Sequence, residues 1–202
     1  MIYLYGASGH AKVIIETLEL EQKKVAGLID DNPSIVSLLG YPVFQELPVS
    51  FDLEKDHLIV SIGGNKIRKE IVSRLNGRFV QSMHPSVNLS KRALIGVGTV
   101  IMAGVSVNSG SKVGNHVILN TNASIDHDCW IGDFVHISPN VALAGDVFVG
   151  EGTQIGIGAC VIQGVRIGKW ATIGAGAVII KNVPDFAVVV GNPGRIIKYN
   201  AF

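Results

Sequence analysis

The strongest constraint on this chain is a six-residue repeat that runs without a break from Met83 to Val183. From Ile95 to Ile179 every sixth residue is aliphatic, and the fourth residue after each of these is small or β-branched. A period of six fits neither the 3.6-residue period of an α-helix nor the simple alternation of a flat sheet. The repeat therefore predicts a parallel β-helix, in which each hexad forms one short strand and one corner.

The repeat also predicts which side chains fill the interior of this β-helix. The aliphatic residue and the residue four positions later both face inward, and three hexads close one triangular coil. Coils stack about 4.7–4.9 Å apart, as neighbouring strands do. We expect the glycines that often follow the aliphatic residue to supply positive φ angles near the corners. We also expect Cys129 and Cys160 to point inward as free thiols.

The first eighty residues have a different pattern. Apolar runs at 2–5, 25–29 and 57–62 alternate with helical segments at 11–20 and 66–75. Strands that alternate with helices predict βαβ units and a small parallel sheet. The expected fold is therefore a small Rossmann-like α/β domain over residues 1–82, followed by an all-β parallel β-helix domain over residues 83–202.

The composition excludes several classes of protein. A net charge of +1, with only 16% charged residues, gives no basic surface for nucleic acid. No segment approaches the roughly 20 apolar residues of a membrane span. The N-terminus lacks the basic region and cleavage site of a signal peptide. We therefore expect a cytoplasmic protein.

Three loops each follow a predicted strand of the α/β domain. They are Gly6–His10, Asp30–Asp31 and Gly63–Asn65. Open α/β sheets bind ligands at the carboxyl ends of their strands. The first loop combines glycine, a Ser8 hydroxyl and a helix N-terminus, which suits a phosphate, although the dinucleotide-binding glycine spacing is missing. Each loop alone could be a turn that binds nothing, but the three together predict a nucleotide-type ligand.

The most polar part of the repeat contains a candidate general base. His127 lies at an outward position between Asp126 and Asp128. An adjacent carboxylate can fix the tautomer of an imidazole and raise its basicity. The alternative is a solvated histidine beside two acids.

The repeat places Gly145 one full coil after His127, so the two should stack about 4.8 Å apart. A backbone N–H at Gly145 would then be an oxyanion donor beside a base. His116 and His136 also fall at outward positions, and His136 lies half a coil from His127, on a different face. In a threefold assembly a residue on another face can reach the site of a neighbouring subunit.

The chain resembles the bacterial nucleotide-amino-sugar N-acetyltransferases of the hexapeptide-repeat acyltransferase superfamily. These include the enzymes of the bacillosamine pathway and of sialic-acid loci. The resemblance covers essentially the whole chain and rests on seven motifs: Gly6–His10, Ser61–Arg68, Leu119–Asn122, Asp126–Asp128, His136, Ala144–Gly145 and Gly191–Gly194.

The resemblance implies a left-handed β-helix, a homotrimer with active sites between subunits, and direct acetyl transfer from acetyl-CoA to the amine of a nucleotide sugar, with UDP-4-amino sugars foremost. No metal is required. The implied catalytic residues are His127 as base, Asp128 (usually Glu in the family) as its orienting partner and Gly145 as oxyanion donor. The implied substrate-binding residues are Gly6, Ser8, Gly9, His10, Asp30, Asp31, Gly63, Gly64, Asn65 and Asn120. The implied acetyl-CoA-binding residues are His136, Gly145, Ile157, Gly174, Ala175, Gly176, Gly191 and Pro193.

Three alternatives remain open from the sequence. The same base could serve O-acetylation of sialic acid or of a capsular sugar. A zinc carbonic anhydrase on the same fold would need three converging histidines, and the spacing of His116, His127 and His136 does not match that family. A non-catalytic nucleotide-sugar binding module would bind the sugar without turnover of acetyl-CoA.

Overall fold

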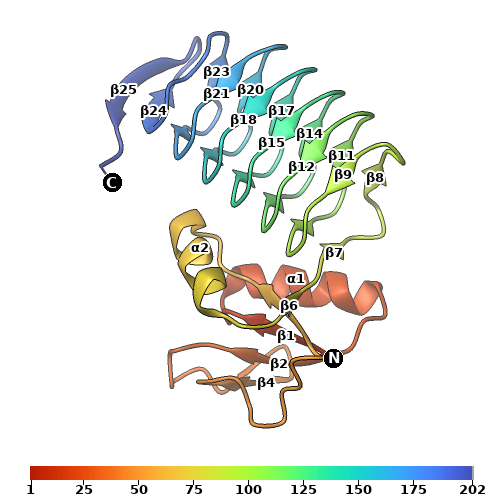
Figure 1. The fold of residues 1–202 in the computed structure, drawn as a ribbon. Coiled ribbons are helices and arrows are strands. Elements are labelled where there is room, and N and C mark those ends of the chain that lie inside the picture. Colours follow the sequence, from red (N-terminus) through yellow and green to blue (C-terminus); the bar gives the residue numbers. More distant parts are fainter. Residues whose placement is uncertain (202) are drawn as a thin grey trace.

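The computed structural model describes residues 1–201 as an α/β domain followed by a parallel β-helix (Figure 1). The two helices, α1 (Gly9–Leu20) and α2 (Asn65–Arg74), lie where the sequence predicts helices. The sheet has the order β3-β4-β2-β1-β5-β6, and only the β3–β4 pairing is antiparallel. Its strands are β1 (Ile2–Tyr5), β2 (Val25–Ile29), β3 (Ser37–Leu38), β4 (Tyr41–Phe44), β5 (His57–Val60) and β6 (Arg78–Phe79).

The β-helix has three faces, each a sheet with one two-residue strand per coil. Face 1 contains β7 (Ser82–Met83), β10 (Val100–Ile101), β13 (Ile118–Leu119), β16 (His136–Ile137), β19 (Gln154–Ile155) and β22 (Thr172–Ile173), extended by the hairpin β24 (Ala187–Val190) and β25 (Arg195–Tyr199). Face 2 contains β8 (Asn88–Leu89), β11 (Ser106–Val107), β14 (Ser124–Ile125), β17 (Ala142–Leu143), β20 (Cys160–Val161) and β23 (Val178–Ile179). Face 3 contains β9 (Leu94–Ile95), β12 (Lys112–Val113), β15 (Trp130–Ile131), β18 (Phe148–Val149) and β21 (Arg166–Ile167).

The predicted interior of the β-helix is confirmed. From Ile101 to Ile179 every aliphatic repeat residue is buried, and so is every small repeat residue from Thr99 to Val183. Strands one coil apart pair in register, as Ile131 with Val149 does. Each hexad therefore adds the same two side chains to a continuous apolar column.

Two details of the repeat differ from expectation. The glycines after the aliphatic residues do not have positive φ; they let adjacent coils approach, since a Cβ on Gly150 would lie 2.6 Å from Lys169 N. The positive φ angles occur at the corner residues instead, among them Asp128. The expectation for Cys160 was wrong: this residue precedes the inward-facing Val161 and is exposed, whereas Cys129 is buried, and both are free thiols.

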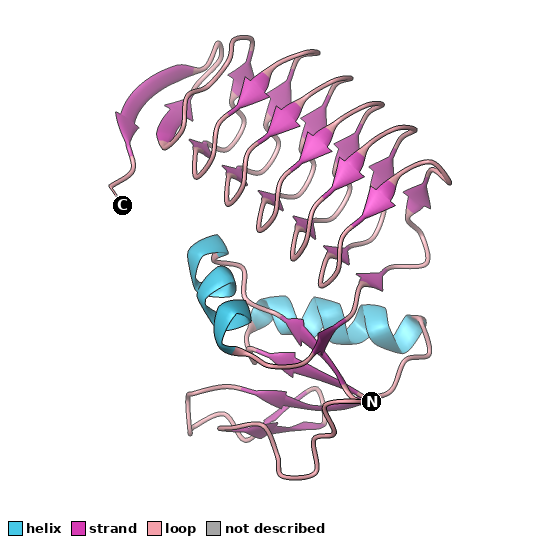
Figure 2. Ribbon diagram, in the orientation of Figure 1, coloured by secondary structure: helices cyan, strands magenta, loops and turns pink. Residues whose placement is uncertain are grey.

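The two parts of the chain share a hydrophobic core. Both helices lie between the sheet and the β-helix (Figure 2). The buried residues Ile14, Ile15 and Leu18 of α1 belong to the same cluster as Val100 and Ile118 of face 1. Burial of α1 on both sides fixes the orientation of the α/β domain on the first coils of face 1.

Polar contacts from α2 complete this junction. The guanidinium of Arg68 is only 2% exposed and donates to the carbonyl oxygens of His116 and Phe134, both at 2.9 Å. It also donates to the Asn65 side-chain oxygen at 2.9 Å. Burial lowers the pKa of Arg68 to about 9. A cation this deeply buried needs several acceptors, and both domains supply them.

Candidate functional site

The three predicted loops meet at one edge of the sheet, where β1, β2 and β5 end. The Ala7 N–H donates to the Asp30 carboxylate at 2.8 Å, and the Ser61 hydroxyl donates to the Gly6 carbonyl at 2.7 Å. The Tyr5 hydroxyl donates to Asp31 at 3.0 Å. These bonds join the first loop to Asp30 and to Ser61, which comes just before the third loop, so the glycine-rich and acidic segments form one surface.

The polar groups of this edge are not all available to a ligand. Asp30 also accepts from the Asn32 N–H at 3.0 Å, so its carboxylate shapes the loops. Ser8 makes no side-chain capping bond to α1 and is exposed, as are Gly9 and Asp31. The available groups of the edge therefore include a hydroxyl, a carboxylate and backbone beside a helix N-terminus.

Asn65 has a different position from the one expected for a substrate contact. Its amide nitrogen donates to the carbonyl oxygens of Gly152 at 3.0 Å and Thr153 at 3.2 Å, and its side-chain oxygen accepts from Arg68. Because of these bonds, the Asn65 side chain is part of the junction between the domains and is not available to a substrate. Gly63 is half-buried and Gly64 is exposed at the same loop.

His10 and His136 bring the loop edge against face 1. Their ring centroids are 6.4 Å apart, and the side-chain nitrogens of Asn120 and His136 are 3.1 Å apart. His136 also bonds the backbone of Gly63. Burial, and secondly the charge of Arg68, lowers the pKa of both histidines to about 4. Both rings are therefore neutral near pH 7, and His10 Nε2 is buried without a partner among residues 1–201.

His116 points outward from the β-helix as predicted, but it is only 5% exposed because the α/β domain covers it. Its ring stacks on Phe134 and meets Phe79 edge to face, with centroids 5.3 Å and 4.6 Å away. Burial lowers the pKa of His116 to about 4. His116 is therefore a packing residue at the junction between the two domains.

His127 lies at the corner between faces 2 and 3, with its side chain 59% exposed. Its Nδ1 is 2.9 Å from the Asp128 carboxylate, while the His127 N–H donates to Asp126 at 2.8 Å. Asp128 therefore orients the ring and Asp126 fixes the backbone, a division that the sequence left open. The bond to Asp128, followed by the charge of Asp126, raises the pKa of His127.

Asp128 reaches the imidazole despite its short side chain because its φ is +60°. Aspartate is among the few residues with a side chain that tolerate this left-handed conformation. Asn108, one coil earlier, donates to Asp126 at 2.9 Å and supports the second carboxylate. The corner geometry thus brings the short Asp128 side chain within hydrogen-bond distance of the ring.

Gly145 lies against the His127 ring, as the coil spacing predicts. A Cβ on Gly145 would be 2.6 Å from both Cε1 and Nε2 of His127. Within the part of the chain that the structure describes, no protein group accepts a hydrogen bond from the Gly145 N–H. A glycine at this position allows close approach of the imidazole to a backbone donor.

The candidate residues are not brought together in one chain. The loop edge, His10, Asn120 and His136 lie at face 1, and the corner with His127 is the one opposite that face. The predicted acetyl-CoA residues are also divided. Three of them, Ile157, Ala175 and Gly176, are exposed at the corner between faces 1 and 2, and Gly174 directly follows β22 of face 1. Gly191 and Pro193 are exposed between β24 and β25.

The residue whose role sequence reasoning missed is Arg68, which it names only as the last residue of the Ser61–Arg68 motif. Asn65, Arg68 and Ile71 are the buried residues of α2, and this spacing of three was the available signal for a buried arginine. Residues 1–201 contain no group of three or more His, Cys, Asp or Glu that could hold a metal ion. In the same range, no helix has the length and apolarity needed to span a membrane.

Comparisons with known proteins cover both domains. Residues 1–75 match the PglD N-terminal domain, and residues 146–181 match the bacterial transferase hexapeptide family (six repeats). A segment of 112 residues is 37% identical to UDP-N-acetylbacillosamine N-acetyltransferase of Bacillus subtilis (strain 168). The match covers 50% of this chain and 51% of that protein, so it spans about half the length of this curated relative.

Solved structures are similar over nearly the whole chain. The acetyltransferase domain of PglB from Neisseria gonorrhoeae is 36% identical, with a TM-score of 0.91 over 97% of this chain and 98% of that one. A mutant of perosamine N-acetyltransferase from Caulobacter crescentus, in complex with CoA and GDP-perosamine, is 38% identical, with a TM-score of 0.90 over 98% and 96%. By fold and by these relatives, the chain belongs to the bacterial nucleotide-amino-sugar N-acetyltransferases of the hexapeptide-repeat superfamily.

Proposed function

We propose that this protein transfers the acetyl group of acetyl-CoA to the amine of a nucleotide-linked amino sugar. The observation that carries the proposal is the corner where His127, oriented by Asp128, lies against Gly145. The relatives act on UDP-linked and GDP-linked amino sugars, which favours an amine over a hydroxyl acceptor. A UDP-4-amino sugar is the first candidate. O-Acetylation of a sialic acid or capsular sugar remains the second.

The proposed reaction is direct transfer. The sugar amine attacks the thioester carbonyl, and His127 Nε2 accepts the proton that the amine loses as the C–N bond forms. The Gly145 N–H donates to the oxyanion of the tetrahedral intermediate. When the C–S bond breaks, the protonated His127 returns this proton to the departing thiolate, so CoA leaves as the free thiol and the base is neutral again. The raised pKa of His127 suits this role, since a general base works best with a pKa near the working pH.

We further propose that the active site forms between subunits of a homotrimer. Within one chain the loop edge lies at face 1 and His127 at the opposite corner. A second copy that brings its corner to face 1 of the first would join the two halves. It would also bring Gly145 of one copy toward Ile157 and Ala175 of the next, which reunites the proposed acetyl-CoA residues.

The nucleotide would bind at the loop edge, with phosphates near Ser8 and the α1 N-terminus and with Asp31 facing a sugar hydroxyl or a base edge. His10 and Asn120 lie where the sugar would leave this edge. We place the reaction in the cytoplasm, an assignment consistent with the two free cysteines.

The test is release of CoA thiol from acetyl-CoA with UDP-, GDP- and dTDP-linked 3-amino and 4-amino sugars, alongside free sialic acid as a hydroxyl acceptor. We expect rapid release with one amine, and a product in which one acetyl group replaces one hydrogen. Turnover with the hydroxyl acceptor alone would move the assignment to O-acetylation. Sugar binding without thiol release from any acceptor would favour a non-catalytic binding module.

A further inference from the structure

Face 3 differs from the other two faces of the β-helix. The α/β domain covers the first coils of face 1, and face 2 presents small residues such as Ser106, Ser124 and Ala142. Face 3 instead carries a row of large side chains on consecutive coils, which we call the face 3 ridge. Its members are Lys112, Trp130, Phe148 and Arg166, paired in register.

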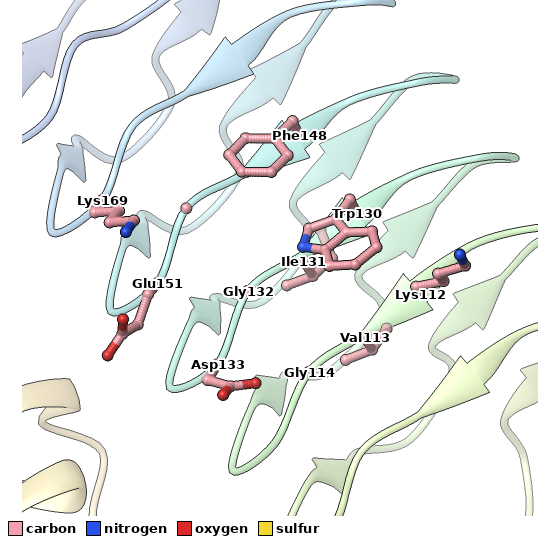
Figure 3. Close-up of a pocket in the computed structure, with 11 residues that line it drawn as sticks. Lys112, Val113, Gly114, Trp130, Ile131, Gly132, Asp133, Phe148, Glu151 and Lys169 are labelled. Carbon is pink, nitrogen blue, oxygen red and sulfur yellow. The ribbon is translucent and has the colours of Figure 1, made fainter.

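The ridge combines two aromatic rings, the exposed Trp130 and the half-buried Phe148, with two cations. Trp130 is 50% exposed, and Lys112 Nζ lies 5.4 Å from the centroid of its ring. Arg166 lies 4.3 Å from the Phe148 centroid. Lys112, Trp130 and Phe148 line a groove of about 360 Å³, with Asp133 and Glu151 across from the aromatic rings (Figure 3).

On this surface the carboxylates have partners within the protein, whereas the two cations of the ridge have no ion pair in the described part of the chain. Asp133 accepts from the Asn115 N–H at 2.7 Å, and Glu151 pairs with Lys69 of α2. Neither Lys112 nor Arg166 forms an ion pair with a carboxylate of residues 1–201. The ridge therefore complements a ligand with an anionic group beside an apolar ring face. A nucleotide sugar has both, in its diphosphate and its pyranose ring.

The ridge is continuous with the proposed active corner. Trp130 follows His127 by three residues, so their Cα atoms are within about 10 Å. Trp130 lies on the same coil as His127, and Lys112 lies one coil earlier, toward the α/β domain. The proposed acetyl-CoA residues Gly145, Ile157 and Ala175 all lie on later coils. Lys112 and Trp130 therefore lie on the side of His127 where the nucleotide sugar would bind, away from the proposed acetyl-CoA residues.

We infer that Trp130 and Lys112 form an acceptor platform and determine specificity. The sugar ring stacks on Trp130 and the amine points to His127. Lys112 pairs with the diphosphate from the side opposite the Ser8 loop, which the neighbouring copy supplies. This inference rests on the proposed function and adds two residues that contact the acceptor.

Steady-state kinetics of Trp130→Ala and Lys112→Gln would test the platform. We expect KM for the nucleotide sugar to rise about tenfold or more in each variant, with KM for acetyl-CoA within about twofold of the parent value. Trp170→Phe, which removes the second tryptophan of the chain, is the matched control and should change neither constant. Unchanged KM for the sugar in both ridge variants would overturn the inference.

A binding readout separates this inference from the proposed function. In Trp170→Phe the fluorescence comes from Trp130 alone, and we expect quenching when the nucleotide sugar binds. Quenching without acetyl transfer would contradict the proposed function but would still support the acceptor platform. If Trp130→Ala instead lowers the oligomer mass in light scattering and raises both KM values alike, the ridge is a subunit contact and the platform is wrong.

Discussion

The histidines of this protein occupy two opposite environments. His127 is exposed at a corner of the β-helix, and its bond to Asp128 raises its pKa. His10, His116 and His136 lie at the domain junction, where burial, assisted by the Arg68 charge, lowers their pKa to about 4. The same side chain is thus prepared as a base in one region and held neutral in the other.

The difference shows what each region is built to do. At the corner, water and two carboxylates favour the imidazolium that a base must become during the reaction. At the junction, neutral rings can pack against aromatic and aliphatic groups without the desolvation cost of a second cation beside Arg68. Substitutions at the corner should therefore change rates, while substitutions at the junction should change stability.

The largest expected effect is on rate. His127→Ala should lower kcat by about 10²–10⁴-fold, as expected for loss of a general base. Because the ring is exposed, the melting temperature should stay within about 2 °C of the parent value. His57→Ala is the control and should leave both quantities unchanged. A rate within a few-fold of wild type would show that the base lies elsewhere.

Arg68→Met should have the reverse effect. It leaves carbonyl oxygens of both domains without their buried donor, so we expect a loss of about 3 kcal/mol or more in the free energy of unfolding. That loss corresponds to a fall of roughly 6–12 °C in melting temperature, measured by scanning fluorimetry. Lys69→Met, at an exposed position of the same helix, should change the melting temperature little. Equal shifts in the two variants would refute the role given to Arg68.

Acid should destabilise the junction. Below pH 6.5 the unfolded histidines bind protons, whereas His10, His116 and His136 in the folded protein do so only near a pKa of about 4. Stability is therefore full above about pH 6.5 and decreases as the pH falls toward 4. We expect a fall in melting temperature on the order of 5–10 °C between pH 7 and pH 5. His116→Phe should flatten this dependence, and an unchanged slope would argue against a neutral buried His116.

Gly145→Ala tests the contact between the base and its neighbouring coil. The new methyl group would lie 2.6 Å from the His127 ring and displace it, so kcat should fall about 10–100-fold. The melting temperature should change little because the exposed ring can move aside. Full activity in this variant would mean that the ring does not work in the observed position.

The smallest expected effect is that of Asp128→Asn. Loss of the carboxylate should lower the pKa of His127 and move the acid limb of the kcat profile to lower pH, because the base must be neutral to accept a proton. We expect about a tenfold loss in kcat near neutral pH. Asp126→Asn, which changes the carboxylate that bonds the backbone, should move the acid limb less. The reverse ranking would assign the orienting role to Asp126.

The fold was largely predictable because its signals are local and repeated. Strands β1 and β2 and the inward residues of the β-helix were predicted from apolar runs and from the period of six. The misplaced residue was Cys160, which lies one position away from the inward slot. The short strands β3, β4 and β6 were missed. Strands β4 and β6 pair with strands earlier in the chain, and β3, which pairs with β4 in a local hairpin, has only two residues and so shows no alternating pattern.

The sequence by itself determined the coil register, and with it the stacking of Gly145 on His127, since a strict repeat leaves one way to superpose the coils. Only the tertiary structure decided that Asp128 orients the ring, that Asn65 and Arg68 join the domains, and that His116 is buried. Those outcomes depend on corner dihedral angles and on contacts between residues about 50 to 90 positions apart. No periodic pattern encodes such contacts, because each of them occurs once.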